Sequence, residues 1–239
     1  MPNLKIFLDP GHGGKDSGAC GHGMKESDIV LEVAQILSQT LKSVNIDVKL
    51  SRSTDTYVNI NDRYNAANAW GADYFISIHV NAGKGTGVET FVYQDLSERS
   101  RKGMVLAEAV TNIFAQTMGL KNRGVKRDDQ SNAGSLGVLR YTHMPAILVE
   151  LAFIDTSKPD AELLKYNRHE MAVALADGIF SALGLPKHLV HFEIFGKQMD
   201  IPGMIINGST YAQVRPIVEE IGCCITWDET NNTVVINKT

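Results

Sequence analysis

Three short apolar runs that predict buried strands each lead into a side chain that can bind a metal or move a proton. These pairs are Leu4–Asp9 with His12, Tyr74–Ile78 with His79, and Ala146–Val149 with Glu150. In an open α/β sheet, functional groups gather outside the carboxyl ends of the strands, so we expect these three side chains to meet at one sheet edge. Glu26 directly precedes the first long predicted helix and would lie above the same edge.

This set of side chains has the composition of a hydrolytic metal site. Two imidazoles and one carboxylate are typical ligands of catalytic Zn²⁺, which keeps one coordination position open for water. A second carboxylate beside that water suits a general base. His22, in the same glycine-rich segment as His12, is a rival ligand, and the residue types alone leave the choice open.

Each of these residues also has a purely structural interpretation. Taken alone, His12 fits a turn, His79 fits a hydrogen-bonded core histidine, and Glu26 fits the solvated start of a helix. Glu150 resists this interpretation, because a buried carboxylate without a partner costs several kcal/mol. The glycines around His12 form neither a GxGxxG nor a GxxxxGK[ST] pattern, which argues against a phosphate-binding loop.

Strand and helix signals alternate over the first 185 residues. The alternation predicts an α/β fold with a mostly parallel twisted sheet flanked by helices. Residues 121–137 are predicted to form a polar, functional loop, because they are too many for a simple connection. Expected strands are Leu4–Asp9, Val48–Ser51, Tyr74–Ile78, Val88–Tyr93 and Ala146–Val149, and expected helices are Ile29–Val44 with Ser27 as N-cap, Asn61–Trp70 before Gly71, Arg101–Met118 before Gly119, and Met171–Leu183.

The character of the sequence changes at Gly184-Leu185-Pro186, which predicts a helix end followed by a linker. We therefore predict a catalytic domain over residues 1–185 and a small α+β domain over residues 190–239. The second domain has one amphipathic helix, Val214–Ile221, and a hairpin signal in which Ile225–Trp227 and Thr233–Ile236 flank a polar turn.

Composition excludes several classes of protein. The 23 basic and 27 acidic residues give a formal charge of −4, which argues against nucleic-acid or anionic-membrane partners. No apolar run approaches the ~18 residues of a membrane span, so no integral membrane segment is expected. The three cysteines include a vicinal pair and predict no disulfide framework. The N-terminus lacks the features of a secretory signal, so we expect synthesis in the cytoplasm without a signal peptide.

An ordered set of motifs resembles the zinc-dependent N-acetylmuramoyl-L-alanine amidases of the amidase-3 type. The set comprises Ile6–Gly14, Glu26, Ser77–Ala82, Gly87–Thr90 and Pro145–Glu150, and the likeness spans residues 3–183. The resemblance implies one Zn²⁺ per chain, held by His12, Glu26 and His79, with Glu150 as the catalytic carboxylate. It also implies peptidoglycan as substrate, cut at the amide that joins the lactyl group of N-acetylmuramic acid to L-alanine.

Four further residues are candidates for substrate binding. Arg123 and Arg127 are loop cations that suit an oxyanion, and the loop around them could instead order the stem peptide. His143 precedes Pro145 and could line a cleft, and Asn81 lies in the motif that contains His79.

The C-terminal residues resemble the small domain named after the N-terminus of copper amine oxidases. The matching pieces are Ile206–Arg215, Trp227-Asp228 and Val234–Ile236. No His/Cys cluster accompanies them, so the name does not imply copper here. We expect this domain to bind the cell wall or to form a homodimer.

The preferred hypothesis is a phage endolysin that is made in the cytoplasm, is released at lysis and acts on the cell wall. A bacterial autolysin or a sporulation-associated amidase is the alternative. Two rivals are a zinc peptidase of another α/β family and a non-catalytic wall-binding protein that has kept the fold. The presence of all four polar residues (His12, Glu26, His79 and Glu150) argues against the non-catalytic rival.

Overall fold

The computed structural model describes residues 3–95, 97–131, 134–185, 189–194, 197–206, 209–212, 214–228 and 233–238. The chain divides into two compact units, Met1–Pro186 and Lys187–Thr239. Residues 186–188 of the predicted linker and residues 229–232 of the predicted hairpin turn lie outside the described residues. Within the described segments, no helix is both long and apolar enough to cross a membrane.

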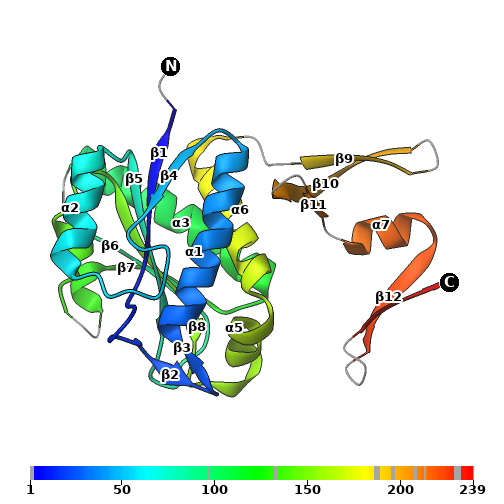
Figure 1. Cartoon of the computed structure of the whole chain (residues 1–239), viewed down its shortest axis with the longest axis horizontal. Coiled ribbons are helices and arrows are strands. Elements are labelled where there is room, and N and C mark those ends of the chain that lie inside the picture. Colours follow the sequence, from blue (N-terminus) through cyan, green and yellow to red (C-terminus); the bar gives the residue numbers. More distant parts are fainter. Residues whose placement is uncertain are drawn as a thin grey trace. The chain divides into compact units, whose positions relative to one another are not determined.

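The first unit is built on a six-stranded sheet with the order β4-β1-β5-β8-β6-β7 (Figure 1). Strands β4, β1, β5 and β8 are parallel, whereas β6 is antiparallel to β8 and parallel to β7. The expected mostly parallel sheet is therefore confirmed. The strands are β1 (Lys5–Pro10), β4 (Asp47–Leu50), β5 (Tyr74–Asn81), β6 (Val88–Val92), β7 (Asn122–Arg127) and β8 (Ala146–Phe153).

The predicted polar loop at 121–137 is wrong in its first half, because β7 occupies Asn122–Arg127. This strand pairs only with β6 and forms the edge of the sheet. An edge strand can be polar and charged, because one of its sides faces solvent. Its sequence NRGVKR therefore lacks the apolar pattern of a buried strand. A 3₁₀ turn at Asp128–Gln130 follows it.

Four long helices pack on the sheet, and three of them end as expected. Left-handed glycines at Gly71, Gly119 and Gly184 terminate α2, α3 and α6, a conformation that glycine adopts without steric cost. The long helices are α1 (Glu26–Ser43), α2 (Ile60–Trp70), α3 (Glu98–Met118) and α6 (Arg168–Leu183). Shorter elements are β2 (Cys20–Gly21), β3 (Met24–Lys25), α4 (Gly137–Arg140), a π-helical turn at Ser157–Ala161, and α5 (Glu162–Tyr166).

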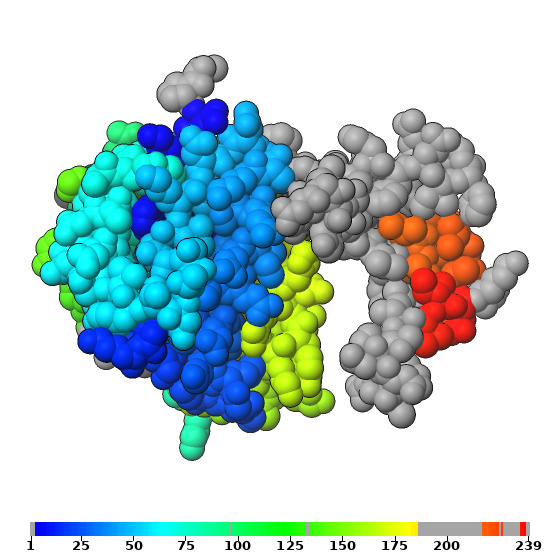
Figure 2. Space-filling model, in the orientation of Figure 1, coloured from blue at the N-terminus to red at the C-terminus, as the bar shows by residue number. Residues whose placement is uncertain are grey.

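The two faces of the sheet differ in what covers them. One face packs against α1, α3 and α6 through a continuous apolar core. On the other face, Phe7, Phe75 and Leu148 pack with residues of α2 and α4 near the starts of the parallel strands. In the space-filling view, α1 (blue) and the segment from β4 to α2 (cyan) form one continuous surface (Figure 2).

On the α2 face, the same strands change from apolar to polar toward their carboxyl ends. On this face, Phe7 of β1 is followed by Asp9, and Phe75 of β5 is followed further along by His79. In β8, Leu148 is followed by Glu150. Side chains two residues apart share a face of a strand, so these polar groups continue the row of core residues. His79 and Glu150 are thus placed where the apolar cover of α2 and α4 stops.

The second unit is a small α+β domain, as expected from the sequence. Strands β9 (Leu189–Ile194), β10 (Lys197–Ile206) and β11 (Ser209–Ala212) form an antiparallel sheet of order β11-β10-β9. The predicted helix is α7 (Val214–Glu220), and the predicted hairpin is β12 (Cys223–Asp228) paired with β13 (Thr233–Lys238).

Candidate functional site

His12 lies in the glycine-rich loop after β1, at a positive φ of 58°. The loop carbonyls are fixed by buried arginines: Arg63 Nη2 donates to His12 O at 2.7 Å, and Arg52 Nη2 donates to Gly11 O at 2.7 Å. A Cβ on Gly11 would lie 2.3 Å from Cε1 of His79, so only glycine lets the loop pass this close to that ring.

Glu26 is the first residue of α1, and its carboxylate is held by backbone donors. Oε2 accepts the Ala19 N–H at 2.8 Å, and Oε1 accepts the Val80 N–H at 2.9 Å. The expected N-cap role of Ser27 is wrong, since the N-cap of α1 is Lys25, two residues earlier, and Ser27 is already helical. The first N–H groups of the helix, those of Glu26 and Ser27, donate to loop carbonyls, so a side-chain cap is not needed.

Glu26 Oε1 lies between the two imidazoles. It is 3.2 Å from His12 Nε2 and 3.0 Å from His79 Nδ1. The ligand atoms of the three residues all lie within 4.8 Å of one another, and this is the only such group among the described residues. The two rings meet edge to face, with centroids 4.9 Å apart. Three segments far apart in sequence thus deliver two nitrogens and one oxygen to one point.

These residues fit a Zn²⁺ ion. Tetrahedral ligands about 2.0–2.1 Å from zinc are about 3.3 Å from each other, close to the distances between the Glu26 oxygen and the two nitrogens. His12 Nδ1 lies 2.9 Å from Asp16 Oδ2. A carboxylate on one ring nitrogen fixes the tautomer and directs the other nitrogen to the metal, an arrangement common in zinc sites.

In the metal-free site, the two imidazoles bind protons more tightly than free histidines do, because Glu26 lies between them. Burial lowers the pKa of His12, but the hydrogen bond and charge of Glu26 and Asp16 outweigh it and raise that pKa to about 9. The pKa of His79 is also raised, because Glu26 outweighs the effect of burial. Burial raises the pKa of Glu26, yet the two histidines hold it well below its usual range. A metal would therefore displace protons from the imidazoles.

Glu150 lies beside the cluster on β8, opposite His79 in the β5–β8 pairing. Its Oε2 is buried and has no hydrogen-bond partner. Burial raises the pKa of Glu150 to about 7; His79 opposes this effect, and the charges of Glu26 and Glu89 add to it. A carboxyl group that changes protonation near neutral pH is suited to accept and return a proton.

The rival ligand His22 is not brought to the cluster. It occupies the turn between β2 and β3, at a φ of 49°, and its side chain is exposed. The metal group among the described residues does not include it.

The candidate substrate residues separate into two groups. Asn81 and Arg123 both contact Glu89, which lies opposite Glu150 in the β6–β8 pairing. Arg127 lies at the far end of β7, level with Val92 and Ile147, and forms an ion pair with Asp129.

His143 is exposed and precedes β8, so it lies at the amino end of the strand that carries Glu150. Arg127 and His143 therefore lie at the other end of the strands from Glu150. Neither residue is part of the site proposed below.

Sequence reasoning missed several residues around this site. Glu89 lies within β6, a short strand whose residues are all buried, and a carboxylate inside a predicted strand is the kind of signal that marked Glu150. Lys126 gave no signal, because its strand was predicted as a loop. The roles of Arg52 and Arg63 depend on carbonyl groups about 40 to 50 positions away in the chain, such as Gly11 O and His12 O, so no local pattern reveals them.

Comparison with known proteins agrees with this geometry. The N-acetylmuramoyl-L-alanine amidase family model matches residues 6–181, and the copper amine oxidase N-terminal domain matches residues 193–239. The chain is 40% identical over 188 residues to the sporulation-specific N-acetylmuramoyl-L-alanine amidase of Bacillus subtilis (strain 168), covering 77% of this chain and 70% of that protein. It is 42% identical over 189 residues to the endolysin of Bacillus phage SPP1, covering 76% of this chain and 67% of that protein.

A solved structure is also similar. The N-acetylmuramoyl-L-alanine amidase AmiC2 of Nostoc punctiforme superposes with a TM-score of 0.67 at 33% identity, covering 76% of this chain and 97% of that chain. The matched region includes β1, α1, β5 and β8, which deliver the four site residues. By sequence, fold and site, the chain belongs to the N-acetylmuramoyl-L-alanine amidase family.

Proposed function

We propose that the protein hydrolyses peptidoglycan at the amide between the lactyl group of N-acetylmuramic acid and L-alanine, with one Zn²⁺ per chain. The carrying observation is the group of His12, Glu26 and His79, whose ligand atoms lie within 4.8 Å, next to the unpartnered carboxylate oxygen of Glu150. His12 Nε2, Glu26 Oε1 and His79 Nδ1 would hold the metal.

The division of roles follows from the contacts of the two carboxylates. Glu26 has both oxygens engaged by backbone N–H groups and by the histidines, so it suits a fixed ligand. Glu150 has a buried oxygen without a partner, so it suits a group that exchanges a proton. Zn²⁺ would supply Lewis-acid polarisation of the scissile carbonyl and lower the pKa of water.

Glu150 would accept the proton of the attacking water and then donate it to the leaving nitrogen of L-alanine. The position of Glu150 supports these two proton transfers, because only one strand spacing separates it from His79 across the β5–β8 pairing. Asp16 would keep His12 in the tautomer that presents Nε2 to the metal. Arg52 and Arg63 would hold the loop that carries His12 in place.

For the biological setting, we infer lysis of a host wall by a phage, with a sporulation-associated or autolytic role as the alternative. Both settings have relatives, since one similar protein is a phage endolysin and another is a sporulation-specific amidase. Expression inside Bacillus cells together with a membrane-permeabilising protein separates them. Rapid lysis of vegetative cells supports the endolysin, and intact vegetative cells with altered spores support the alternative.

For the domain organisation, we propose a catalytic domain over residues 1–185 and an accessory domain over 190–239 that binds the cell wall or forms a homodimer. The support is that the two family matches, at 6–181 and 193–239, do not overlap.

The reaction itself is tested by digesting purified peptidoglycan and identifying the new termini by mass spectrometry. We expect free N-terminal L-alanine on the released peptides and intact glycan strands, loss of activity after chelation, and recovery with added Zn²⁺. Release of single amino acids, or new reducing sugar ends, would contradict the proposed function.

A further inference from the structure

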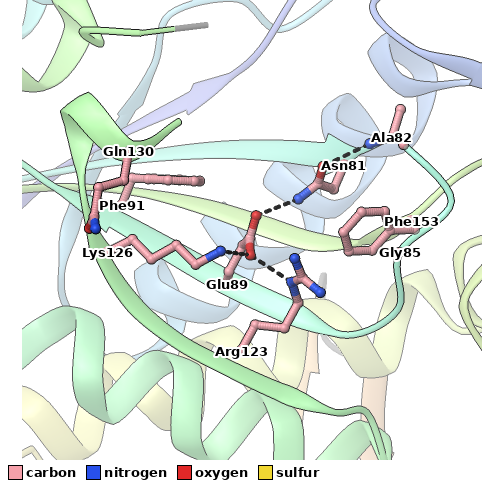
Figure 3. A pocket seen from close by; sticks show the side chains of 10 residues that line it. Asn81, Ala82, Gly85, Glu89, Phe91, Arg123, Lys126, Gln130 and Phe153 are labelled. Atoms are coloured by element: carbon pink, nitrogen blue, oxygen red, sulfur yellow. Dashed lines mark hydrogen bonds and ion pairs between the residues drawn. The ribbon is translucent and has the colours of Figure 1, made fainter. Parts of the chain in front are cut away.

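A small pocket lies next to Glu150, on the side away from the histidines. It has a volume of about 170 Å³ and is formed by β6, β7 and the segment after β5. We call it the Glu89 pocket, after the carboxylate at its centre (Figure 3). Its lining residues are Asn81, Ala82, Gly83, Gly85, Glu89, Phe91, Arg123, Lys126, Gln130 and Phe153.

The Glu89 pocket contains more positive than negative charge. Glu89 is the only carboxylate that lines it, with its side chain 6% exposed, and two cations contact the same oxygen. Arg123 Nε and Lys126 Nζ lie 2.6 and 2.5 Å from Glu89 Oε2, while Asn81 Nδ2 donates to Oε1 at 2.7 Å. One cation would neutralise Glu89, so the second leaves an excess charge of about +1 in the pocket.

Both cations keep donors that Glu89 does not use. The Arg123 side chain is 28% exposed and that of Lys126 is 31% exposed. Phe153 lies under the Arg123 guanidinium at 4.9 Å and fixes its orientation. Within the described part of the chain, neither Arg123 Nη2 nor the remaining two N–H groups of Lys126 have an acceptor. Donors of this kind suit an anion, and a planar carboxylate matches the geometry of a guanidinium.

The position of the pocket relates it to the scissile bond. His79, Glu150 and Glu89 form one row across β5, β8 and β6. Since neighbouring strands are about 4.8 Å apart, Glu89 lies about 10 Å from His79, with Glu150 between them. A substrate whose amide lies between the histidines and Glu150 would therefore extend one of its two sides toward the Glu89 pocket.

The positive charge of the pocket indicates which side of the substrate, the glycan or the stem peptide, extends toward it. The glycan bears hydroxyl and acetamido groups, and its lactyl carboxyl is already consumed in the scissile amide. The stem peptide bears free carboxylates, and one residue spans at most about 3.6 Å, so its second and third residues come within reach of the pocket. The second residue, D-glutamate, is linked through its γ-carboxyl and keeps its α-carboxylate free.

We propose that the Glu89 pocket binds a carboxylate of the stem peptide, through Arg123 and Lys126, and thereby orients the peptide that leaves. This inference rests on the proposed function for its substrate. Two sources supply the same chemistry: the α-carboxylate of the second residue and the side-chain carboxylate of a diaminopimelate at the third. A bound carboxylate makes charge-assisted hydrogen bonds, which correspond to about 10- to 100-fold in affinity.

The test measures binding of peptide products by calorimetry, so that it does not depend on turnover. Three C-terminally amidated peptides are compared: L-Ala-γ-D-Glu-L-Lys with one carboxylate at the second residue, its D-isoglutamine counterpart with none, and L-Ala-D-isoglutamine-diaminopimelate with one at the third. We expect the zinc-loaded wild type to bind at least one carboxylate peptide 10- to 100-fold more tightly than the peptide without one. The tighter of the two identifies the source.

Variants locate the preference in the pocket. Lys126→Met removes one cation but leaves Arg123 on Glu89, and it should abolish most of the preference, while Lys126→Arg should retain it. Lys121→Met removes the same charge from an exposed residue just before β7, outside the lining, and should leave the preference unchanged. Thermal melting confirms that each variant is folded.

Equal wild-type affinity for all three peptides would overturn the proposal, and so would a Lys126→Met variant with the full preference. These outcomes are independent of catalysis. A preference measured in a protein that fails to cleave the lactyl amide would uphold the pocket and refute the proposed function.

Discussion

Glutamine at position 150 isolates the proton transfer from the metal site. Glu150→Gln keeps the size of the side chain and one carbonyl oxygen, but it cannot accept a proton from water. Because both oxygens of Glu26 are already engaged and Glu150 is no ligand in our assignment, the variant should bind one Zn²⁺ per chain like the wild type. Turnover should fall about 10²- to 10⁴-fold, the usual contribution of general acid–base catalysis.

The same substitution has a calculable effect on the stability of the metal-free protein. Burial, together with the charges of Glu26 and Glu89, raises the pKa of Glu150 from 4.5 to about 7, against the effect of His79. The folded state therefore binds this proton more tightly than the unfolded state, and its stability falls as pH rises from about 4.5 to 7. The loss from this one group amounts to about 2–3 kcal/mol between pH 5 and pH 8.

Three assays check these effects. Urea unfolding of metal-free wild type and Glu150→Gln at pH 5 and pH 8 should show that the variant gains about 2–3 kcal/mol relative to wild type at the higher pH. Turnover on a soluble muropeptide gives the catalytic effect, and metal analysis gives the zinc content. A variant within a few-fold of wild-type turnover would refute the catalytic role, and a variant that lost its zinc would make Glu150 a ligand.

Three further predictions follow from contacts around the site. Asp16→Asn removes the carboxylate on His12 Nδ1 and should weaken zinc binding about 10- to 100-fold in competition with a chelator, so unchanged affinity would contradict the role given to Asp16. Arg63→Met strands the buried carboxylate of Asp9, 2.7 Å from Arg63 Nη1, and should lower the free energy of unfolding by about 3–5 kcal/mol. A loss below about 1 kcal/mol in urea denaturation would show that Asp9 is satisfied by its other partners. A chain that ends at Leu185 should fold and turn over soluble muropeptides at the wild-type rate, since the first unit spans Met1–Pro186. An insoluble product would show that the second unit completes the first.

The convergence of His12, His79 and Glu150 could be predicted because it depends only on parallel strands. Each of these residues follows or ends an apolar run, and the register of β1, β5 and β8 aligns the carboxyl ends of these strands. Periodicity and glycine stops fix such elements locally, without knowledge of their tertiary partners.

The positions of Arg123 and Arg127 could not be predicted, because they depend on a reversal of strand direction. Strand β6 is antiparallel to β8, and β7 follows β6. The start of β7, which carries Arg123, therefore lies near Glu150, and its end, which carries Arg127, lies at the opposite edge. No residue in β7 signals this reversal, because an edge strand has no apolar pattern to predict even its existence.

The capping of α1 shows the same limit on a smaller scale. Ser27 is a good N-cap by residue type, yet the helix starts at Glu26. Carbonyl groups of Ser17 and Ala19 satisfy its first N–H groups. This arrangement brings Glu26 to the histidines. The N-cap preference of serine therefore fails at a position where the site needs the helix to begin earlier.

Every role assigned to this site depends on His12, Glu26 and His79 being the metal ligands. The decisive measurement is the zinc content per chain after extensive dialysis of His12→Ala, Glu26→Ala and His79→Ala, with His22→Ala as the matched control from the same glycine-rich segment. We predict about one Zn²⁺ per chain in the wild type and in His22→Ala, and a marked loss in each of the other three variants. Full zinc in Glu26→Ala together with loss of zinc in His22→Ala would contradict the assignment.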